Sequence, residues 1–267
     1  MKKQVRNDLR FILLLIRQKL IRLMAFRLSF FGAFFADGTL FLVQLLVFNV
    51  IYGQVESIGG WGRGQMLIFV GTFSMINGLN MLIYFFGLAD LSGKIRSGAL
   101  DAYITKPGST LLRITFEEVD FGSAPLVLLS AGIIGYGLSV AGINVTLPLL
   151  LGYTALVLLM TLLYYDMELI LRCIPFFLVG VSAIDRLEGE MLMLNFKIPG
   201  VLFRGVFKVL FYFVMPYGIM STVPTQFVTG AWTPLGLLHA LAVVVVFTWF
   251  ALWLWRVGLR HYKSASS

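Results

Sequence analysis

The sequence predicts an all-α integral membrane protein with six transmembrane helices, an N-terminal amphipathic interfacial helix and a re-entrant hairpin before the last span. One reason is composition: 59% of the 267 residues are hydrophobic and 13% are charged, against about 45–50% and about 25% in soluble domains. A second is that apolar residues gather in long runs that suit a bilayer. A third is that residues 1–27 carry eight Lys or Arg and a single Asp.

The same numbers exclude several classes of protein. A soluble enzyme or a disordered tail would not carry so much apolar surface. Cys173 is the one cysteine, so no intrachain disulfide can form. Nucleic acid is not an expected partner, because basic residues at this density would need a soluble face, which so apolar a chain lacks. Outside residues 1–27 the 13 basic and 12 acidic residues nearly cancel. The chain therefore divides into a basic N-terminal segment, 1–27, and a nearly neutral membrane domain, 28–267.

The N-terminal segment, 1–27, is predicted to lie on the membrane. Apolar residues recur at spacings of three and four from Val5 to Leu23, while the cations favour another face, and this pattern suits a helix in contact with anionic lipid headgroups. The alternative is a cytosolic start of the first span. Arg17 and Arg22 favour the interfacial helix, because cations are costly in hydrocarbon. These cations also interrupt the apolar stretch that a signal peptide would need.

The membrane domain contains five clear apolar runs and one weaker run. Residues 143–146 are short and uncharged, so we expect the runs on either side to form a tight helical hairpin. Residues 53–65 are rich in glycine and are expected to form a loop with Trp61 at the membrane interface. The clear runs are 28–52, 66–88, 122–142, 147–165 and 235–256, and the weaker one is 167–184.

Residues 196–230 are apolar but are interrupted by cations and prolines, so they are either a seventh span or a re-entrant pair of half-helices. Charge decides between the two. The N-terminus is basic, and the tail after the last span carries Arg256, Arg260 and Lys263, which places both ends in the cytoplasm by the positive-inside rule. Two cytoplasmic ends require an even number of crossings. We therefore predict six spans plus a re-entrant stretch at 197–224 that closes the outer end of a pathway.

No catalytic or metal-binding signature is present in the sequence. The string from Gly87 to Lys94 is similar to a phosphate-binding loop, but it has five residues between its glycines and Ile95 in place of the required Ser or Thr. His239 and His261 are too far apart in the sequence to form a metal cluster with Cys173. We therefore predict no catalytic residue, no metal site and no cofactor in this chain, and do not expect an enzyme.

Residues 89–120 form the one long loop expected on the cytoplasmic side. They contain the string Gly-Ala-Leu-Asp-Ala-Tyr-Ile-Thr-Lys-Pro at 98–107. This string resembles the permease subunits of ABC-2-type exporters, with the viologen- and drug-exporter-like permeases as the nearest group. The segment 215–230, with its two prolines and terminal glycine, resembles the stretch before the last span of that family. The charged segment 185–190 departs from the family pattern, which is more apolar there.

The resemblance implies a mechanism and partners. Family permeases act in pairs, identical or related, in the bacterial inner membrane, and each docks a separate cytosolic ATPase that carries ATP and Mg. A coupling helix in the first inner loop transmits ATPase closure to the spans. In this sequence the coupling residues would be Gly98, Leu100, Asp101, Tyr103, Lys106 and Pro107.

Other interpretations of this chain stay open at this stage. The segment 105–108 can simply turn the chain back into the next span. The whole protein can be a non-transporting anchor or binding subunit of a membrane complex. An intramembrane enzyme is disfavoured because paired catalytic residues are missing.

Five residues inside the predicted spans are candidates for a substrate pathway or gate. They are Asp37, Asn77, Asn80, Pro216 and Pro224. Charged and polar residues at membrane depth are expensive, and they are functional candidates for that reason. The alternative for Asp37 is a bond to neighbouring backbone, and for the asparagines it is hydrogen bonding between helices.

Charged residues also mark the expected ends of spans. Glu168 and Arg172 are four residues apart and are expected to form an ion pair at the start of the fifth span. Glu117, Glu118 and Asp120 precede the third span and are expected to be solvated.

Overall fold

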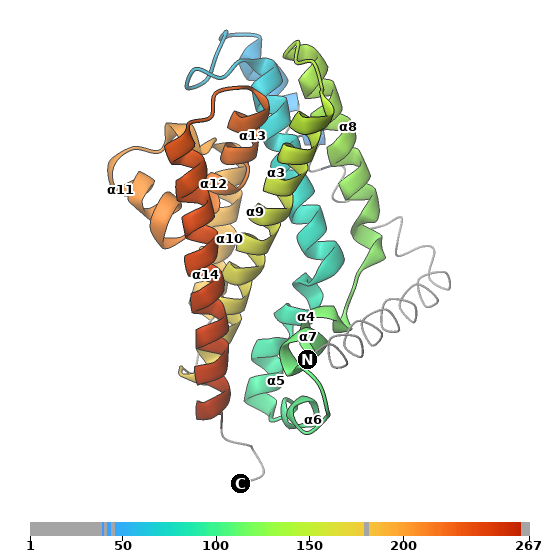
Figure 1. Ribbon diagram of the computed structural model, residues 1–267, viewed down its shortest axis with the longest axis vertical. Helices are drawn as coiled ribbons and strands as arrows, with labels where there is room; N and C mark the ends of the chain where they lie inside the picture. Colours follow the sequence, from blue (N-terminus) through green and yellow to red (C-terminus); the bar gives the residue numbers. More distant parts are fainter. Residues whose placement is uncertain (1–38, 40–41, 44–45, 179–181, 263–267) are drawn as a thin grey trace.

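The computed structural model describes residues 39, 42–43, 46–178 and 182–262, and its described secondary structure is helical apart from one isolated bridge between Ile58 and Trp61 (Figure 1). The predicted interfacial helix, 1–27, and Asp37 lie outside the described residues. The helices are α3 (Arg63–Ile83), α4 (Phe85–Ala89), α5 (Leu91–Ser97), α6 (Asp101–Ile104), α7 (Thr110–Glu117), α8 (Ala124–Val140), α9 (Leu147–Cys173), α10 (Ser182–Lys197), α11 (Gly205–Val209), α12 (Tyr217–Met220), α13 (Thr222–Val228) and α14 (Pro234–His261).

Four helical segments of the described chain are long and apolar enough to cross a membrane. They are 63–83, 121–140, 147–176 and 234–261. A fifth candidate is a bent pair, 205–214 and 217–228, whose halves meet at 78°. The chain is therefore a multi-pass membrane protein of helices, as the composition predicts.

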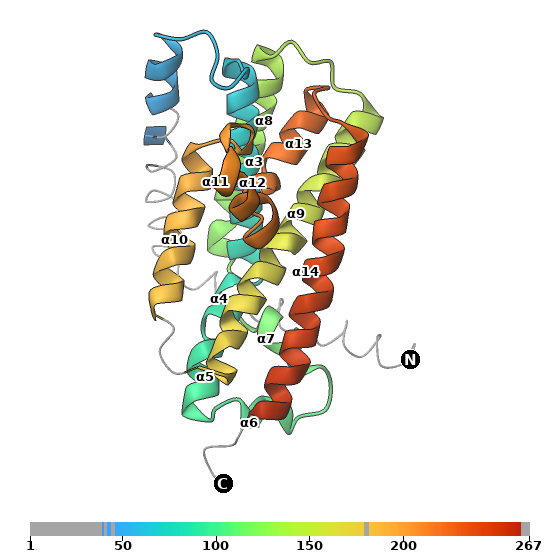
Figure 2. The same ribbon diagram turned by 90° about the vertical axis from the view of Figure 1, so that its left-hand side faces the viewer.

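The predicted short turn at 143–146 is confirmed, but α8 and α9 do not pack tightly on each other, because each packs instead against α3. Helix α8 ends at Val140, and Gly142 takes a left-handed conformation with φ 67° before α9 begins at Leu147. Helix α3 packs against both α8 and α9, and α14 packs against α9 (Figures 1 and 2).

The predicted boundary between the fourth and fifth spans is wrong. We expected one span at 147–165 and another at 167–184, but α9 continues without a break through Asp166 to Cys173. The helix continues because its polar residues are satisfied within the protein and do not need to reach water. It gives way to a short 3-10 turn that contains Pro175, which cannot donate a helical hydrogen bond. Residues 167–173 thus end α9, and 182–184 begin α10.

The second predicted span, 66–88, also differs from the structure. Helix α3 begins at Arg63 and ends at Ile83, where Tyr84 leaves the helical conformation before α4 starts at Phe85. The Tyr84 hydroxyl donates to the Thr161 carbonyl at 2.9 Å and packs edge-on against Tyr165, which fixes the break against α9. Residues 84–89 therefore belong to the end of the bundle that carries α5, α6 and α7.

Trp61, in the glycine-rich loop before α3, is buried against the bundle. Its ring packs edge-on against Phe69 at 5.7 Å, and its carbonyl accepts from the Tyr52 hydroxyl at 2.9 Å. These contacts hold the loop that precedes α3 against the bundle.

The bent pair lies in the half of the bundle away from α5–α7 (Figures 1 and 2). Its first half is α11 followed by a π-helical turn, Leu210–Val214, and Pro216 stands at the bend. Phe203 and Phe211 stack at 4.5 Å, and Tyr217 packs edge-on against Tyr164 of α9. The bend is therefore held by aromatic packing against the bundle.

Candidate functional site

The end of the bundle formed by α5, α6 and α7, here called the end module, is built on a separate apolar cluster. Leu88, Leu91, Leu100 and Ile114 are fully buried there. They pack with residues from the last turns of two spanning helices, including Trp255 of α14. Apolar burial of this kind is worth about 1.5–3 kcal/mol per large side chain. The end module is therefore anchored to α9 and α14 rather than suspended as a loose loop.

Two of the predicted coupling residues, Gly98 and Leu100, have structural roles in this module. Gly98 ends α5 with φ 76°, a conformation that glycine adopts without strain. The Leu100 amide then donates to the Lys94 carbonyl at 3.2 Å, and its side chain enters the apolar cluster. Together they turn the chain from α5 into α6.

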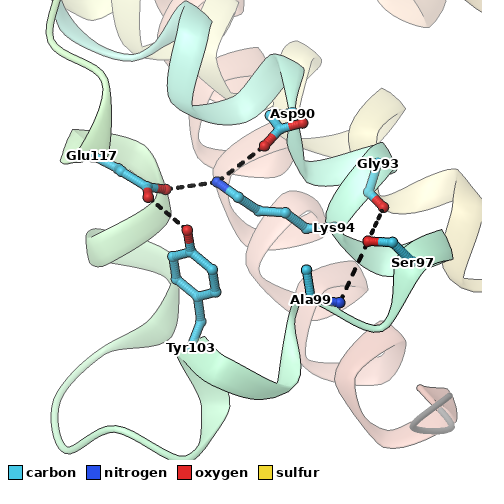
Figure 3. A network of polar contacts seen from close by, with 7 residues as sticks. All are labelled: Asp90, Gly93, Lys94, Ser97, Ala99, Tyr103 and Glu117. Carbon is cyan, nitrogen blue, oxygen red and sulfur yellow. Dashed lines mark hydrogen bonds and ion pairs between the residues drawn. The ribbon is translucent and has the colours of Figure 1, made fainter. Parts of the chain in front are cut away.

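A polar network joins α5, α6 and α7 (Figure 3). The Lys94 ammonium lies 2.6 Å from Glu117 Oε2 and 3.5 Å from Asp90. The Tyr103 hydroxyl donates to Glu117 Oε1 at 2.6 Å, and the Lys94 nitrogen stands 4.7 Å from the centre of the Tyr103 ring. Glu117 was expected to be solvated, and this is only partly so: its side chain is 30% exposed, but Lys94 and Tyr103 bind both of its oxygens.

Lys94 itself is 8% exposed, so its charge depends on these partners. Burial lowers the pKa of Lys94, while the hydrogen bond and the charge of Glu117 raise it, and the net pKa is raised. The ammonium is therefore charged at neutral pH. A paired and hydrogen-bonded charge of this kind becomes costly when one partner is removed.

The turn between α6 and α7 is exposed and well ordered by caps. Ile104, Lys106 and Pro107 lie on its surface. The Arg113 guanidinium donates to the Pro107 carbonyl at 2.9 Å, and Ser109 caps α7 by accepting from the Leu112 amide at 3.3 Å. The turn thus exposes apolar and cationic side chains, and hydrogen bonds hold its backbone in place.

Asp101 lies where α6 meets the end of α14. Burial raises the pKa of the Tyr262 phenol, and the neighbouring Asp101 carboxylate raises it further. Tyr262 directly follows α14, and its ring packs edge-on against Phe176 at 6.1 Å. Asp101 therefore sits beside an aromatic group shared by the ends of α9 and α14.

The end module carries no phosphate-binding loop. Gly87 and Lys94 belong to two different helices, and the Lys94 amide is used in a helical hydrogen bond to Asp90. Among the described residues, no group of three or more His, Cys, Asp or Glu is placed to hold a metal ion.

The pathway candidates are not brought together into one site. Asn77 and Asn80 lie in the second half of α3, where Asn77 donates to the Met81 sulfur at 3.8 Å and Asn80 is 1% exposed. Pro216 and Pro224 belong to the bent pair in the other half of the molecule, and both are buried. Asn80 Oδ1 has no hydrogen-bond partner among the described residues.

Sequence reasoning missed Asp166, which falls between the predicted spans 147–165 and 167–184. Its carboxylate is 1% exposed and accepts from the Thr248 hydroxyl of α14 at 2.5 Å. The signal was present, since an aspartate inside a long apolar run must find a partner. Glu168 and Arg172 do form the expected ion pair, at 3.3 Å, but in the last turns of α9.

Comparison with known proteins identifies the chain at the level of a family. A family model described as ABC-2 family transporter protein matches residues 39–266. No curated protein and no solved structure gives a significant match. The matched range contains all the helices described above.

Proposed function

The chain belongs to the ABC-2 family of transporter proteins, and from this premise we propose that it is the permease subunit of an ATP-driven exporter. The permease forms the substrate pathway in a homodimer or heterodimer, and ATP is hydrolysed on a separate cytosolic ATPase with its Mg ion. This chain itself is not an enzyme. The observation that carries the proposal is the end module, whose exposed turn is anchored to two spanning helices.

The turn between α6 and α7 is the proposed docking point for the ATPase. Ile104 and Leu112 are 43% and 37% exposed, and Lys106 stands between them in the sequence. Apolar anchors flanked by a charge are typical of protein interfaces. A displacement of this turn would be transmitted to α5 and α7 through the contacts of Glu117, and to α14 through Tyr262.

We also propose an orientation and a number of crossings. The cations at the α5–α7 end and the basic segment 1–27 favour the cytoplasm for that end, in a bacterial inner membrane. Counting the apolar run 28–52, the four long helices and α10 as crossings gives six spans with both termini inside, and the bent pair is then the re-entrant hairpin. The cations of the described chain at that end are Lys94, Arg96, Lys106, Arg113, Arg172, Arg256 and Arg260.

Co-purification tests the ATPase partnership. The tagged full chain, extracted from its native membranes, should recover a cytosolic ATPase. Lys106→Glu should reduce the recovered ATPase several-fold, because it reverses the exposed charge of the turn. Lys208→Glu is the matched control, since Lys208 is exposed on α11 in the other half of the molecule. Transport that persists with no ATPase in the complex contradicts the proposal.

Charge reversal of Asp101 together with Lys106 tests coupling. The double variant should retain a folded chain but hydrolyse ATP without matching transport. Normal transport per ATP would remove this turn from the mechanism. A chain that binds an ATPase and moves no solute in any assay would instead be the anchoring subunit considered from the sequence.

Topology is tested with a cysteine at Lys197 in a Cys173→Ala background. A membrane-impermeant thiol reagent should label it from outside intact cells, whereas a cysteine at Lys106 should label only after permeabilisation. The reverse pattern would overturn the proposed orientation.

A further inference from the structure

Helix α10 carries a charged stripe on its exposed face. Arg186, Gly189, Glu190, Met193 and Lys197 are all exposed. Their spacings of one, three and four residues place them on one side of an α-helix. Three of the five carry a full charge, so this stripe is not a surface suited to lipid tails.

The stripe lies at the depth of the membrane-spanning core. The opposite side of α10, with Met191, Leu192 and Leu194, packs against the main apolar cluster. That cluster contains residues from the middle of spanning helices, such as Val157 of α9 and Val243 of α14. Figure 2 shows α10 running beside the bundle between the levels of α5 and α11.

A charged side chain at this depth is expensive in contact with lipid. Lys, Arg or Asp at the centre of a membrane helix costs roughly 2.5–3.5 kcal/mol by insertion scales, and such residues almost always face protein or water. The exposed face of α14 at the same depth is apolar and shows what a lipid-facing surface of this protein looks like; it includes Leu238, Leu241, Val245 and Trp249.

We infer that the exposed face of α10 lines a water-filled pathway through the membrane that admits polar, charge-bearing solutes. The inference rests on the proposed permease function and assigns the lining of its path. Arg186 and Lys197 stand on either side of Glu190 along the stripe, so a passing solute meets charges of both signs. None of these residues was among the candidates selected from the sequence.

Thiol accessibility in the full chain tests the inference. In a Cys173→Ala background, single cysteines at Met193 and at Val245 are treated with charged, water-soluble thiol reagents in native membranes. The two positions are matched, since they are 52% and 68% exposed in the isolated chain. Met193→Cys should react at least about tenfold faster, because a thiol in lipid forms little thiolate. Equal, slow reaction at both positions overturns the inference.

A second arm separates a wet path from a packed interface between two copies. If the stripe were buried against a second copy, Met193→Cys would be protected and would cross-link to its counterpart under mild oxidation, and this outcome also overturns the inference. Charge preference gives a further readout: Glu190→Lys should shift the reaction at Met193→Cys toward the anionic reagent several-fold. An unchanged preference would show that Glu190 does not face the path.

The labelling needs no ATPase, so the inference and the proposed function can fail separately. Fast labelling of a chain that recovers no ATPase would support a water-exposed face on α10 and contradict the proposed exporter function. Recovery of an ATPase with no labelling retains the exporter and moves its path away from α10.

Discussion

Helices α10 and α14 each pack one face against the same apolar cluster and leave the other face exposed, yet the two exposed faces differ in chemistry. The face of α14 is made of leucine, valine and tryptophan, while the face of α10 carries Arg186, Glu190 and Lys197. The exposed fraction of a side chain in the isolated chain therefore does not tell whether lipid or water surrounds it. The chemistry of the exposed side chains does, and it indicates hydrocarbon outside α14 and water outside α10.

The two helices are also held in different ways. Thr248 of α14 bonds to buried Asp166 of α9, so a polar clamp fixes α14 near its middle. In α10, the buried Asn195 amide donates to Met191 within the same helix at 2.9 Å. The chain after α10 is instead fixed by a close backbone contact, in which the Gly200 amide donates to Thr222 at 2.9 Å.

The largest expected difference comes from placing a lysine on each exposed face. Val245→Lys should destabilise the inserted protein by about 2.5–3.5 kcal/mol, because the charge faces hydrocarbon. Met193→Lys should cost less than about 0.5 kcal/mol, because a surface change in water is usually small. The amount of membrane-inserted protein and its thermal unfolding in detergent measure both. Equal losses of stability in the two variants would contradict the comparison, because they would place both exposed faces in lipid.

Glycine substitutions compare how the ends of the two helices are packed. A Cβ at Gly200 would collide with the backbone carbonyl of Gly218, and a Cβ at Gly258 would meet the Phe176 ring. Backbone yields less than a side chain, so Gly200→Ala should cost about 1–3 kcal/mol. Gly258→Ala should cost less. Unfolding temperatures compare the two variants, and the opposite order would contradict this packing.

The polar clamp is the next contrast. Thr248→Val removes the donor to Asp166 and should cost about 1 kcal/mol, in the range of hydrogen bonds between membrane helices. Asn195→Leu should be close to neutral, because its hydrogen bond lies within one helix. The same unfolding measurements apply, and a neutral Thr248→Val would mean that the clamp adds nothing to the seating of α14.

The smallest effect on stability is expected from the charges of the stripe. Arg186→Gln and Glu190→Gln should each change the free energy of unfolding by less than about 0.5 kcal/mol. Transport should change while stability does not, which makes these variants the most specific probes of the path. A large loss of folded protein would show that the charges are structural.

The sequence predicted the fold best where one local pattern was enough. The last run, 235–256, is found within α14, which begins at Pro234 behind a Thr233 cap that accepts from the Gly236 amide at 3.1 Å. The short turn between α8 and α9 was predicted from an uncharged break of four residues. In both cases, the apolar run and the residues that cap the helix or turn the chain are neighbours in the sequence.

Features that depend on distant partners could not be predicted. Asp166 lies outside both predicted spans, and nothing near it in the sequence shows that Thr248, 82 residues later, satisfies its carboxylate. Glu117 was expected to be solvated because Lys94, its partner, is 23 residues away. The coupling string at 98–107 was selected by resemblance, and its contacts with the ends of α9 and α14 were found only in the structure.

The position of the Asp166–Thr248 bond along α14 has a geometric consequence. Helix α14 has 28 residues, which is about 42 Å at 1.5 Å per residue. Thr248 lies 14 residues from Pro234 and 13 from His261, so a rigid tilt of α14 about this bond would pivot at the midpoint of the helix. A tilt of about 5° around it moves each end by about 2 Å, in opposite directions. An inward step at the end module is therefore an equal outward step at the far end, with the two motions fixed in a one-to-one ratio.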